Sequence, residues 1–428
     1  MIGRVSVALV HYAAPPVVGG VEHVLGRQAR LIAAAGHEVR VIAGRGSTLG
    51  PGIGFIAIPR IDSRHPEIAR LHVELDAGRL PDEFSDVVAA LGAEIEEALA
   101  GVDVVIAHNV CSLGLNLPLT AALRAMADRG SPRLVLWHHD LAWASAHFRA
   151  ALHDGLPWDL LRTPWPGVRQ VVVSAARQGE LAHLLGIPAA SITIVPNGLD
   201  VASSLRLEPR AAEILARAER AGTTLLLLAP NRATPRKNLE LALRVVAAMR
   251  AAGHAAGLLV TGPIDPHRVG LDGYLDELLA LRHALGLDDV AWFLAAEPGG
   301  TPSDAVVSDL YRLSDALLLT SREEGFGLPI LEAGIHRLPI VCSDLPVLRE
   351  LAGDDALYVD PDGDPAAIAA RVAAHLAANG ALRLARRVRT EYSWEAIYRT
   401  GIAPLLEPAP VPVGSASPGP SPRVSGRV

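Results

Sequence analysis

The stretch "RVSVALVHYAAPPVVGGVEHVLGRQARLIAAAGHEVRVIAG" at residues 4–44 decides the fold class. Its apolar run at 4–10 predicts a β-strand, the Ala/Leu-rich segment at 21–36 predicts a helix, and the β-branched run at 38–44 predicts a second strand. A strand, a helix and a strand in this order form a βαβ unit, which places the two strands in parallel. The first apolar run is too short for the core of a signal peptide, so we expect it to be the first strand of the fold.

The same alternation continues along the chain in two series. Further strands of the first series are predicted at 102–108, 133–138, 168–174 and 191–196, and strands of the second at 223–230, 257–262, 290–294, 315–321, 338–344 and 356–361. Each strand of the second series precedes a plausible helix. The sequence therefore predicts an α/β protein with two Rossmann-like, doubly wound domains.

Length and local composition predict where these domains begin and end. A chain of 428 residues exceeds what one hydrophobic core usually supports. A polar stretch near 200–222 separates the two series, so the predicted domains are 1–205 and 206–391. The segment 392–407 is predicted to be a helix that returns to the first domain, and the Pro/Gly/Ser-rich end at 408–428 is predicted to be a disordered tail.

Bulk composition excludes several classes of function. The net charge is −7, and its 46 acidic and 39 basic residues form no long runs, which argues against a nucleic-acid partner. Only two cysteines occur, Cys111 and Cys342, and they are far apart, so we expect buried thiols rather than a disulfide or a zinc site. No apolar run is long enough to span a bilayer. We therefore expect a cytoplasmic protein without a transmembrane segment.

The only lysine of the chain lies directly after the first strand of the second series, in "PNRATPRKN" at 230–238. Arg232, Arg236 and Lys237 come just ahead of a helix that Asn238 could cap. Cations and the free amides of a helix N-terminus are the groups that bind a diphosphate. The alternative is that these are ordinary solvated loop charges.

A second informative loop, "SREEGFGLPILEAG" at 321–334, follows the strand predicted at 315–321. Glu324 and Glu332 are separated by seven residues, with a Gly-Phe-Gly element between them and Pro329 suited to a first helical turn. Carboxylates accept hydrogen bonds from sugar hydroxyls, and amides next to glycines can meet phosphate oxygens. In doubly wound folds such loops lie at the ligand-binding ends of the strands.

Together with the segment at 19–44 and "VPNGLD" at 195–200, these two loops resemble the retaining glycosyltransferases of family 4, which have the GT-B fold. The resemblance extends to about residue 406. It implies two Rossmann-like domains facing a central cleft. It also implies an enzyme that moves a hexosyl group from a nucleoside diphosphate sugar to the hydroxyl of a glycan or a small polar acceptor.

The resemblance assigns roles to individual residues. Arg232 and Lys237 would bind the donor diphosphate and stabilise the leaving group, Glu324 would contact the transferred sugar, and Glu332 would hold the ribose. Further donor-binding residues that it implies are Phe326, Gly327 and Leu328 in the second domain and Gly19 and Gly20 in the first. His139 would lie near the donor sugar, although the neighbouring His138 could take this place instead.

The chemistry implied by the resemblance is metal-independent. Negative charge grows on the departing diphosphate, and Lys237 and Arg232 would stabilise it in place of a metal ion. Retention would follow from a front-face attack in which a phosphate oxygen takes the proton of the acceptor hydroxyl. No cofactor is expected.

Acceptor residues are harder to predict. Trp143 lies in a segment, 137–166, that also holds Trp137, Trp158 and Trp165 and four histidines. Aromatic rings stack on sugars, so Trp143 and His138 are candidate acceptor residues, as are His108 and Asn109 after the strand at 102–108. The alternatives are that the tryptophans pack this segment onto the domain, that His108 is a core residue and that Asn109 supports a turn.

Two other functions share the fold. A phosphorylase would carry pyridoxal phosphate on a lysine, for which Lys237 is the single candidate. A non-catalytic protein that binds nucleotide sugars is the other alternative, although one would expect it to have lost part of the two loops.

Overall fold

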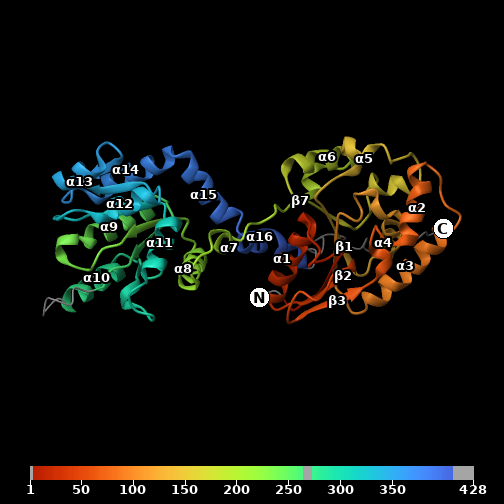
Figure 1. The fold of residues 1–428 in the computed structure, drawn as a ribbon, viewed down its shortest axis with the longest axis horizontal. Coiled ribbons are helices and arrows are strands. Elements are labelled where there is room, and N and C mark those ends of the chain that lie inside the picture. The colour runs from red at the N-terminus through yellow and green to blue at the C-terminus, as the bar shows by residue number, and fades with distance from the viewer. Residues whose placement is uncertain (1–2, 264–271, 408–428) are drawn as a thin grey trace, which may run out of the picture. The chain divides into compact units, whose positions relative to one another are not determined.

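A computed structural model describes residues 3–263 and 272–407 (Figure 1). The chain divides into two compact units, of which the second comprises Leu199–Ser393. The first unit comprises the chain up to Gly198 and resumes at Trp394. The boundary therefore lies before the predicted position 205, because the polar stretch at 200–222 is not a linker. It forms the helices α7 (Val201–Leu205) and α8 (Pro209–Arg220) of the second unit. Helix α8 packs into the core of this unit through Ala211, Ile214 and Leu215.

The first unit contains a parallel sheet of seven strands in the order β3-β2-β1-β4-β5-β6-β7. Its strands are β1 (Ser6–Ala13), β2 (Glu38–Arg45), β3 (Ile53–Ala57), β4 (Val104–His108), β5 (Arg133–His138), β6 (Arg169–Val172) and β7 (Ile192–Ile194). Its main helices are α1 (Gly20–Ala34), α2 (Pro66–Asp76), α3 (Phe84–Ala98), α4 (Leu117–Arg129), α5 (Ala146–Arg149) and α6 (Ala175–Leu185). Strand β3 was missed by the sequence prediction, because it is a short strand at the edge of the sheet and contains Gly54, a residue that strands disfavour.

The second unit repeats this plan with six parallel strands in the order β10-β9-β8-β11-β12-β13. Its strands are β8 (Leu225–Ala229), β9 (Ala256–Val260), β10 (Ala291–Phe293), β11 (Ala316–Leu319), β12 (Ile340–Ser343) and β13 (Ala356–Val359). Its remaining helices are α9 (Leu239–Ala251), α10 (Asp272–Ala284), α11 (Asp304–Leu313), α12 (Leu328–Ile335), α13 (Pro346–Ala352), α14 (Pro365–Ala378) and α15 (Gly380–Glu391). The predicted fold class of two Rossmann-like domains is confirmed.

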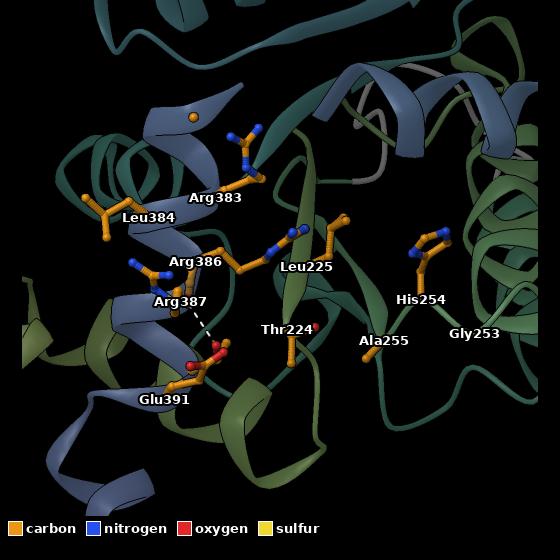
Figure 2. A pocket seen from close by; sticks show the side chains of 12 residues that line it. Thr224, Leu225, Gly253, His254, Ala255, Arg383, Leu384, Arg386, Arg387 and Glu391 are labelled. Atoms are coloured by element: carbon orange, nitrogen blue, oxygen red, sulfur yellow. Dashed lines mark hydrogen bonds between the residues drawn. The ribbon is translucent and has the colours of Figure 1, made fainter. Parts of the chain in front are cut away.

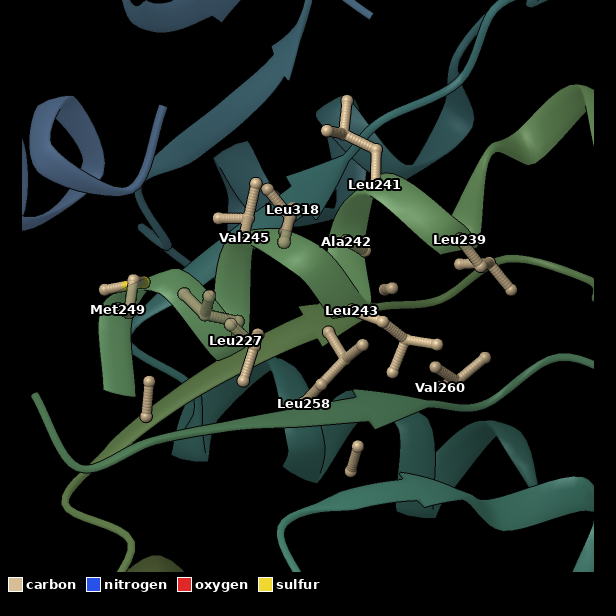
Figure 3. Packing of buried hydrophobic residues seen from close by; sticks show 14 of the residues in the cluster. Leu227, Leu239, Leu241, Ala242, Leu243, Val245, Met249, Leu258, Val260 and Leu318 are labelled. Atoms are coloured by element: carbon tan, nitrogen blue, oxygen red, sulfur yellow. The ribbon is translucent and has the colours of Figure 1, made fainter. Parts of the chain in front are cut away.

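The central strands of each sheet are buried on both faces, which is why they are largely apolar, whereas edge strands such as β3 and β7 are partly exposed. In β8, Leu225 and Leu227 face one core cluster, whereas Leu226 and Leu228 face another. Figure 3 shows the first of these clusters, in which side chains of α9 pack against Leu227 and Leu258 of the sheet. The two cores hold the strands in place, and the loops at the strand ends are left to carry function.

The end of the described chain returns to the first unit. It consists of α16 (Trp394–Ile397), one π-helical turn (Tyr398–Ile402) and α17 (Ala403–Leu406) rather than one regular helix. Trp394, Ile402 and Leu406 are buried with the core of the first sheet. The predicted tail at 408–428 lies outside the described residues.

Candidate active site

The two loops singled out in the second unit follow adjacent strands. Strands β8 and β11 pair in parallel, and the order of the sheet reverses between them. In doubly wound sheets, ligands bind beyond the carboxyl ends of the strands at such a reversal. The loop at 230–238 follows β8 and the loop at 320–327 follows β11, so the topology brings both loops to this point.

Lys237 and Glu324 meet there. The Nζ atom of Lys237 donates to Oε1 of Glu324 at 2.5 Å, and the hydroxyl of Ser321 donates to the same oxygen at 2.8 Å. The side chains of Lys237 and Glu324 are only 10% and 5% exposed. Water and salt screen such a pair weakly, so its charges act strongly on a ligand that reaches them.

The backbone around Lys237 is held from two sides. Residues 235–237 form a 3₁₀ turn, and the hydroxyl of Thr320 donates to the carbonyl of Asn238 at 2.8 Å. Asn238 does precede α9, but the prediction that its side chain caps the helix was wrong. Its φ angle is 51°, and its amide donates instead to the carbonyl of Pro361 at 2.9 Å, because the left-handed conformation turns the side chain away from the helix.

Arg232 and Arg236 lie in the same loop as Lys237 and are exposed at the surface of the second unit. Gly262, which sequence analysis did not single out, supports this loop from the strand next to it. A Cβ atom at position 262 would lie 2.2 Å from the carbonyl oxygen of Asn231 and 2.5 Å from the amide of Arg232. Only glycine allows so close an approach, and a glycine at the end of the strand predicted at 257–262 was the available signal.

Glu332 lies on α12, one turn after Gly327, which precedes the helix with φ 99°. Its Oε2 atom accepts a hydrogen bond from the hydroxyl of Tyr311 at 2.5 Å. The ring of Tyr311 stacks on that of His336, with 5.1 Å between ring centroids, and His336 Nδ1 lies 2.7 Å from the carbonyl oxygen of Glu332. Burial, followed by the bond to Glu332, raises the pKa of Tyr311, so its hydroxyl keeps its proton and remains a donor.

The remaining predicted donor residues of the second unit are accessible. The side chains of Phe326 and Leu328 are 51% and 60% exposed, while Gly327 is buried where its loop meets α12. A Cβ atom at Gly327 would lie 2.7 Å from Leu348. The glycine therefore serves the packing of the loop, and the neighbouring side chains are open to a ligand.

In the first unit, the glycines predicted to bind the donor lie at the N-terminus of α1. Gly19 is the cap residue and Gly20 the first helical residue. A Cβ atom at Gly20 would meet nothing within 4 Å, whereas at Gly19 it would meet the carboxylate of Glu22. The N-terminus of this 15-residue helix is thus open at Gly20, as an anion would require.

A histidine cluster lies at the carboxyl ends of β1, β4 and β5 in the first unit. His108 Nδ1 and His139 Nε2 are 3.3 Å apart and their rings stack, while His11 Nδ1 lies 2.8 Å from the carbonyl oxygen of His108. Nε2 of His11 lies 4.0 Å from Glu22 in the first turn of α1. His11 and Glu22 were missed by sequence analysis, although His11 near the end of a predicted strand was a usable signal.

Burial keeps these imidazoles neutral. It lowers the pKa of His139 to about 4, with smaller contributions from His11 and His138, and it holds the pKa of His108 well below its ordinary value. For His11 the desolvation outweighs the opposite effects of the His108 carbonyl and Glu22. At neutral pH the cluster therefore offers hydrogen bonds without adding positive charge.

The choice between His138 and His139 is clearer in the structure than in the sequence. His138 points to Gln170, with Nε2 2.7 Å from Oε1, on the neighbouring strand β6. His139 instead joins the cluster that includes His11 and His108. Asn109 supports the turn that carries His139, because its side chain accepts hydrogen bonds from the amides of His139 and Asp140 at 2.7 and 3.2 Å.

The tryptophans of the 137–166 segment are packing residues. Trp143 is 7% exposed, packs with Trp158 in a small core cluster, and is covered by the guanidinium groups of Arg149 and Arg162 at 4.7 and 4.0 Å from the ring centroid. Trp137 and Trp165 are likewise buried. At 7% exposure the ring of Trp143 has little surface on which a sugar could stack, so the structure favours the alternative, that Trp143 packs this segment onto the domain.

The remaining sequence predictions concern thiols, metals and membranes. Cys111 and Cys342 are free and buried, as predicted. Within 3–263 and 272–407, no group of three or more His, Cys, Asp or Glu side chains is arranged to hold a metal ion. Over the same residues, no helix is both long enough and apolar enough to cross a membrane.

Each of the two units matches a known protein family. Residues 18–203 match the family model described as Glycosyltransferase Family 4, and residues 212–391 match the model described as Glycosyl transferases group 1. The chain is a GT-B glycosyltransferase of family 4. The resemblance predicted from the loops at 230–238 and 321–334 is confirmed.

Among curated proteins, this glycosyltransferase is similar to the mannosylglucosylglycerate synthase of Thermotoga maritima. The two are 25% identical over 370 residues, which cover 80% of this chain and 82% of that protein. It is 30% identical over 190 residues to the D-inositol 3-phosphate glycosyltransferase of Actinosynnema mirum, covering 41% of this chain and 43% of that protein. A match of 45% identity to the Escherichia coli serotype-specific mannosyltransferase WbdA spans 56 residues, 13% of this chain and 7% of that protein.

Among solved structures, the glycosyltransferase is similar to Anabaena HepE in complex with UDP. The sequence identity is 16%, the TM-score is 0.34, and the match covers 94% of this chain and 99% of the other.

Proposed function

We propose that this glycosyltransferase transfers a hexosyl group from a nucleoside diphosphate sugar to an acceptor hydroxyl, with retention of configuration and without a metal ion. The observation that supports this function is the contact between Lys237 and Glu324 at the point where the order of the second sheet reverses. The loop at 230–238 carries the ammonium of Lys237 and the guanidinium of Arg232, and it ends at the N-terminus of α9. These are the groups that stabilise a departing diphosphate.

Different residues of the second unit bind the diphosphate, the transferred sugar and the ribose of the donor. Lys237 and Arg232 bind the diphosphate and neutralise the charge that grows on the leaving group. Glu324 orients the hydroxyls of the transferred sugar. Its bond to Lys237 fixes the distance between the carboxylate that binds the sugar and the ammonium that binds the diphosphate. Glu332, held by Tyr311, accepts hydrogen bonds from the ribose hydroxyls.

The first unit supplies the other groups of this proposal. The open N-terminus of α1 at Gly20 stabilises negative charge on the diphosphate, and neutral His139 donates or accepts one hydrogen bond at the sugar. Since His139 is neutral at physiological pH, it does not compete with Lys237 for the leaving group. The acceptor hydroxyl attacks on the face from which the diphosphate departs, and a phosphate oxygen takes its proton.

Mannose is the first sugar to test. The relative from Thermotoga maritima is a mannosylglucosylglycerate synthase, and the one from Escherichia coli is a mannosyltransferase. We propose GDP-mannose and UDP-glucose as the first donors for a hydrolysis screen, with release of GDP or UDP as the readout. The anomeric configuration of a transfer product, measured by NMR, then tests retention, and unchanged turnover in EDTA tests metal independence.

The decisive variant is Lys237→Ala. It should lower turnover by several orders of magnitude while the protein stays folded, because the barrier loses a charge that is aimed at the leaving group. Arg236→Ala is the matched control, since it removes a cation next to Lys237 in the same loop and should reduce turnover little. Near-normal transfer by Lys237→Ala, or an equal loss in both variants, would contradict the proposed role.

A further inference from the structure

A second polar pocket lies in the second unit, at the opposite ends of the strands from the loops described above. It has a volume of about 690 Å³, within the range typical of small-molecule sites. It lies where β8 and β9 begin and where α15 passes beside them (Figure 2). The lining residues are Thr224, Leu225, Gly253, His254, Ala255, Gly380, Arg383, Leu384, Arg386, Arg387, Thr390 and Glu391.

Three arginines of α15 contribute to this pocket. Arg383, Arg386 and Arg387 are three and four residues apart, so they lie on one side of the helix. Figure 2 shows the side chain of Arg386 extending from α15 toward the start of β8 at Leu225, with His254 on the far wall. Arg383 donates to the carbonyl of Ala377, which keeps its guanidinium near the start of the helix.

The positive charge of the pocket is largely uncompensated. Glu391 is the single carboxylate among its lining residues, against three guanidinium groups and His254. Within the described residues, the side chains of Arg386 and Arg387 form no hydrogen bond or ion pair. The pocket therefore carries a local excess of positive charge in a chain whose net charge is −7.

The helix that carries these arginines is fixed to the sheet. Arg389, near the end of α15, donates to Oδ2 of Asp315 at 2.7 Å and to the carbonyl of Leu313 at 2.6 Å. Asp315 also accepts the amide of Leu226, the second residue of β8, at 2.7 Å. The side chains of Arg389 and Asp315 are 9% and 5% exposed. The three pocket arginines are therefore presented by a rigid element, which reduces the entropy lost when a ligand binds.

We propose that this pocket binds a phosphate group, as a site separate from the donor site. A guanidinium meets phosphate through two parallel hydrogen bonds, and three guanidinium groups can share the several oxygens of one phosphate, more than a carboxylate offers. The hydroxyl of Thr224 adds a polar group to the wall, whereas that of Thr390 donates to the backbone carbonyl of Arg386 at 2.9 Å. The phosphate belongs either to a soluble phosphorylated compound or to a lipid headgroup.

The test uses the full-length protein and inorganic pyrophosphate in isothermal titration calorimetry. Pyrophosphate also fits the proposed donor site, so the Lys237→Ala protein is titrated in parallel. In the double variant R386A/R387A, binding of pyrophosphate to this pocket should be at least tenfold weaker. The same loss should appear when the two changes are combined with Lys237→Ala. Arg220→Ala, which removes an exposed arginine at the end of α8, should bind as the native protein does.

A second arm distinguishes the source of the phosphate. Phosphatidylcholine vesicles with and without phosphatidic acid are sedimented with each protein. Loss of soluble pyrophosphate binding in R386A/R387A supports a soluble ligand, and loss of vesicle binding alone supports a lipid headgroup. The charge-preserving variant R386K/R387K, which guards against a folding defect, should keep most of the binding.

The proposal is overturned if R386A/R387A binds pyrophosphate and both kinds of vesicle as the native protein does. It is also overturned if citrate, a carboxylate probe, binds the pocket as tightly as pyrophosphate. Neither result depends on whether transfer activity is found, so the pocket and the proposed function are tested separately.

Discussion

Lys237 is the residue on which the proposed donor site depends, and its surroundings suit the one ammonium of a chain otherwise filled with arginine. Its side chain is 10% exposed and approaches a single oxygen of Glu324. A compact ammonium fits this contact as a point charge, whereas a planar guanidinium would need two acceptors in its plane. Lys237→Arg is therefore not a conservative change at this position.

Tyr311 is a positioning residue that acts through Glu332. Tyr311→Phe keeps the buried ring but removes the hydroxyl that donates to Glu332 at 2.5 Å. We expect GDP or UDP, whichever the donor screen identifies, to bind about 10- to 150-fold more weakly, since a hydrogen bond to a charged group is worth about 1.5–3 kcal/mol. Calorimetry measures this affinity, and kcat should change less than KM.

The control for this variant is Tyr274→Phe. Tyr274 donates to Glu240 at 2.7 Å in the same unit, so the change removes a bond of the same kind away from Glu332. In the background of Glu332→Ala, Tyr311→Phe should have no further effect on affinity. An additive loss would show that Tyr311 acts independently of Glu332.

His138 makes the first unit sensitive to acid. Burial lowers its pKa to about 4, against an ordinary value of 6.5. Between these values the unfolded chain binds a proton that the folded chain does not, so the free energy of unfolding falls as the pH drops from about 6.5 to about 4. The loss should amount to a few kcal/mol, at about 1.4 kcal/mol per pH unit.

This pH dependence is measured by chemical unfolding of His138→Gln and of the native protein at several pH values. His138→Gln should reduce the slope between pH 6.5 and 4 by about 1.4 kcal/mol per pH unit, because glutamine does not titrate, while His139 and His108, whose pKa values burial also lowers, keep the remainder. His183→Gln removes an exposed histidine of α6 in the same unit and should leave the slope unchanged. The same slope in all three proteins would show that His138 is not a source of acid sensitivity.

At the scale of elements, α15 depends on one buried ion pair. Arg389→Leu removes the partner of Asp315 and leaves a carboxylate that is 5% exposed with only the amide of Leu226 to bind. Breaking such a pair typically costs about 3–5 kcal/mol. We expect the second unit to lose stability by this amount in urea unfolding, followed by the fluorescence of Trp292, the tryptophan in its core.

Arg349→Leu is the matched control for this loss. Arg349 pairs with Asp344 on the surface of the same unit, where both side chains are about half exposed, and exposed pairs contribute little to stability. A similar destabilisation in both variants would show that the loss comes from arginine removal in general rather than from the buried pair.

At the scale of the whole molecule, both units use the same strand order, with the reversal between the first and fourth strand of each sheet. This repetition explains why both carry their candidate donor residues in equivalent loops. Gly20 follows the first strand of one sheet, and Lys237 follows the first strand of the other. Glu324 follows the fourth strand of its sheet, and the acceptor candidate His108 is the last residue of the corresponding strand β4.

Hydrogen exchange tests whether both units contribute to one donor site. Binding of GDP or UDP should slow amide exchange at 230–240 and 321–336, and also at 15–24 if the N-terminus of α1 meets the diphosphate. The Glu332→Ala protein, at the same nucleotide concentration, should show much less protection. Protection confined to 321–336 would remove the first unit from the proposal.

The amino-acid sequence by itself determined the fold class and the donor loops of the second unit. Apolar runs of strand length alternating with helical periodicity specify parallel sheets, and turn residues after particular strands mark the loops, so Lys237, Glu324 and Glu332 could be found without coordinates. These signals lie within short stretches of sequence, so they can be recognised without the tertiary structure.

The tertiary structure alone decided which residues meet. The contact between Lys237 and Glu324 spans 87 positions and that between His108 and His139 spans 31, while Tyr311, His11 and Gly262 acquire their roles only from such neighbours. Burial also decided that Trp143 is a packing residue and that Arg389 fixes α15 to the sheet, since from the sequence either side chain could have faced the solvent. Proximity between distant segments and the desolvation of charge arise only when the chain is packed, and no local pattern encodes them.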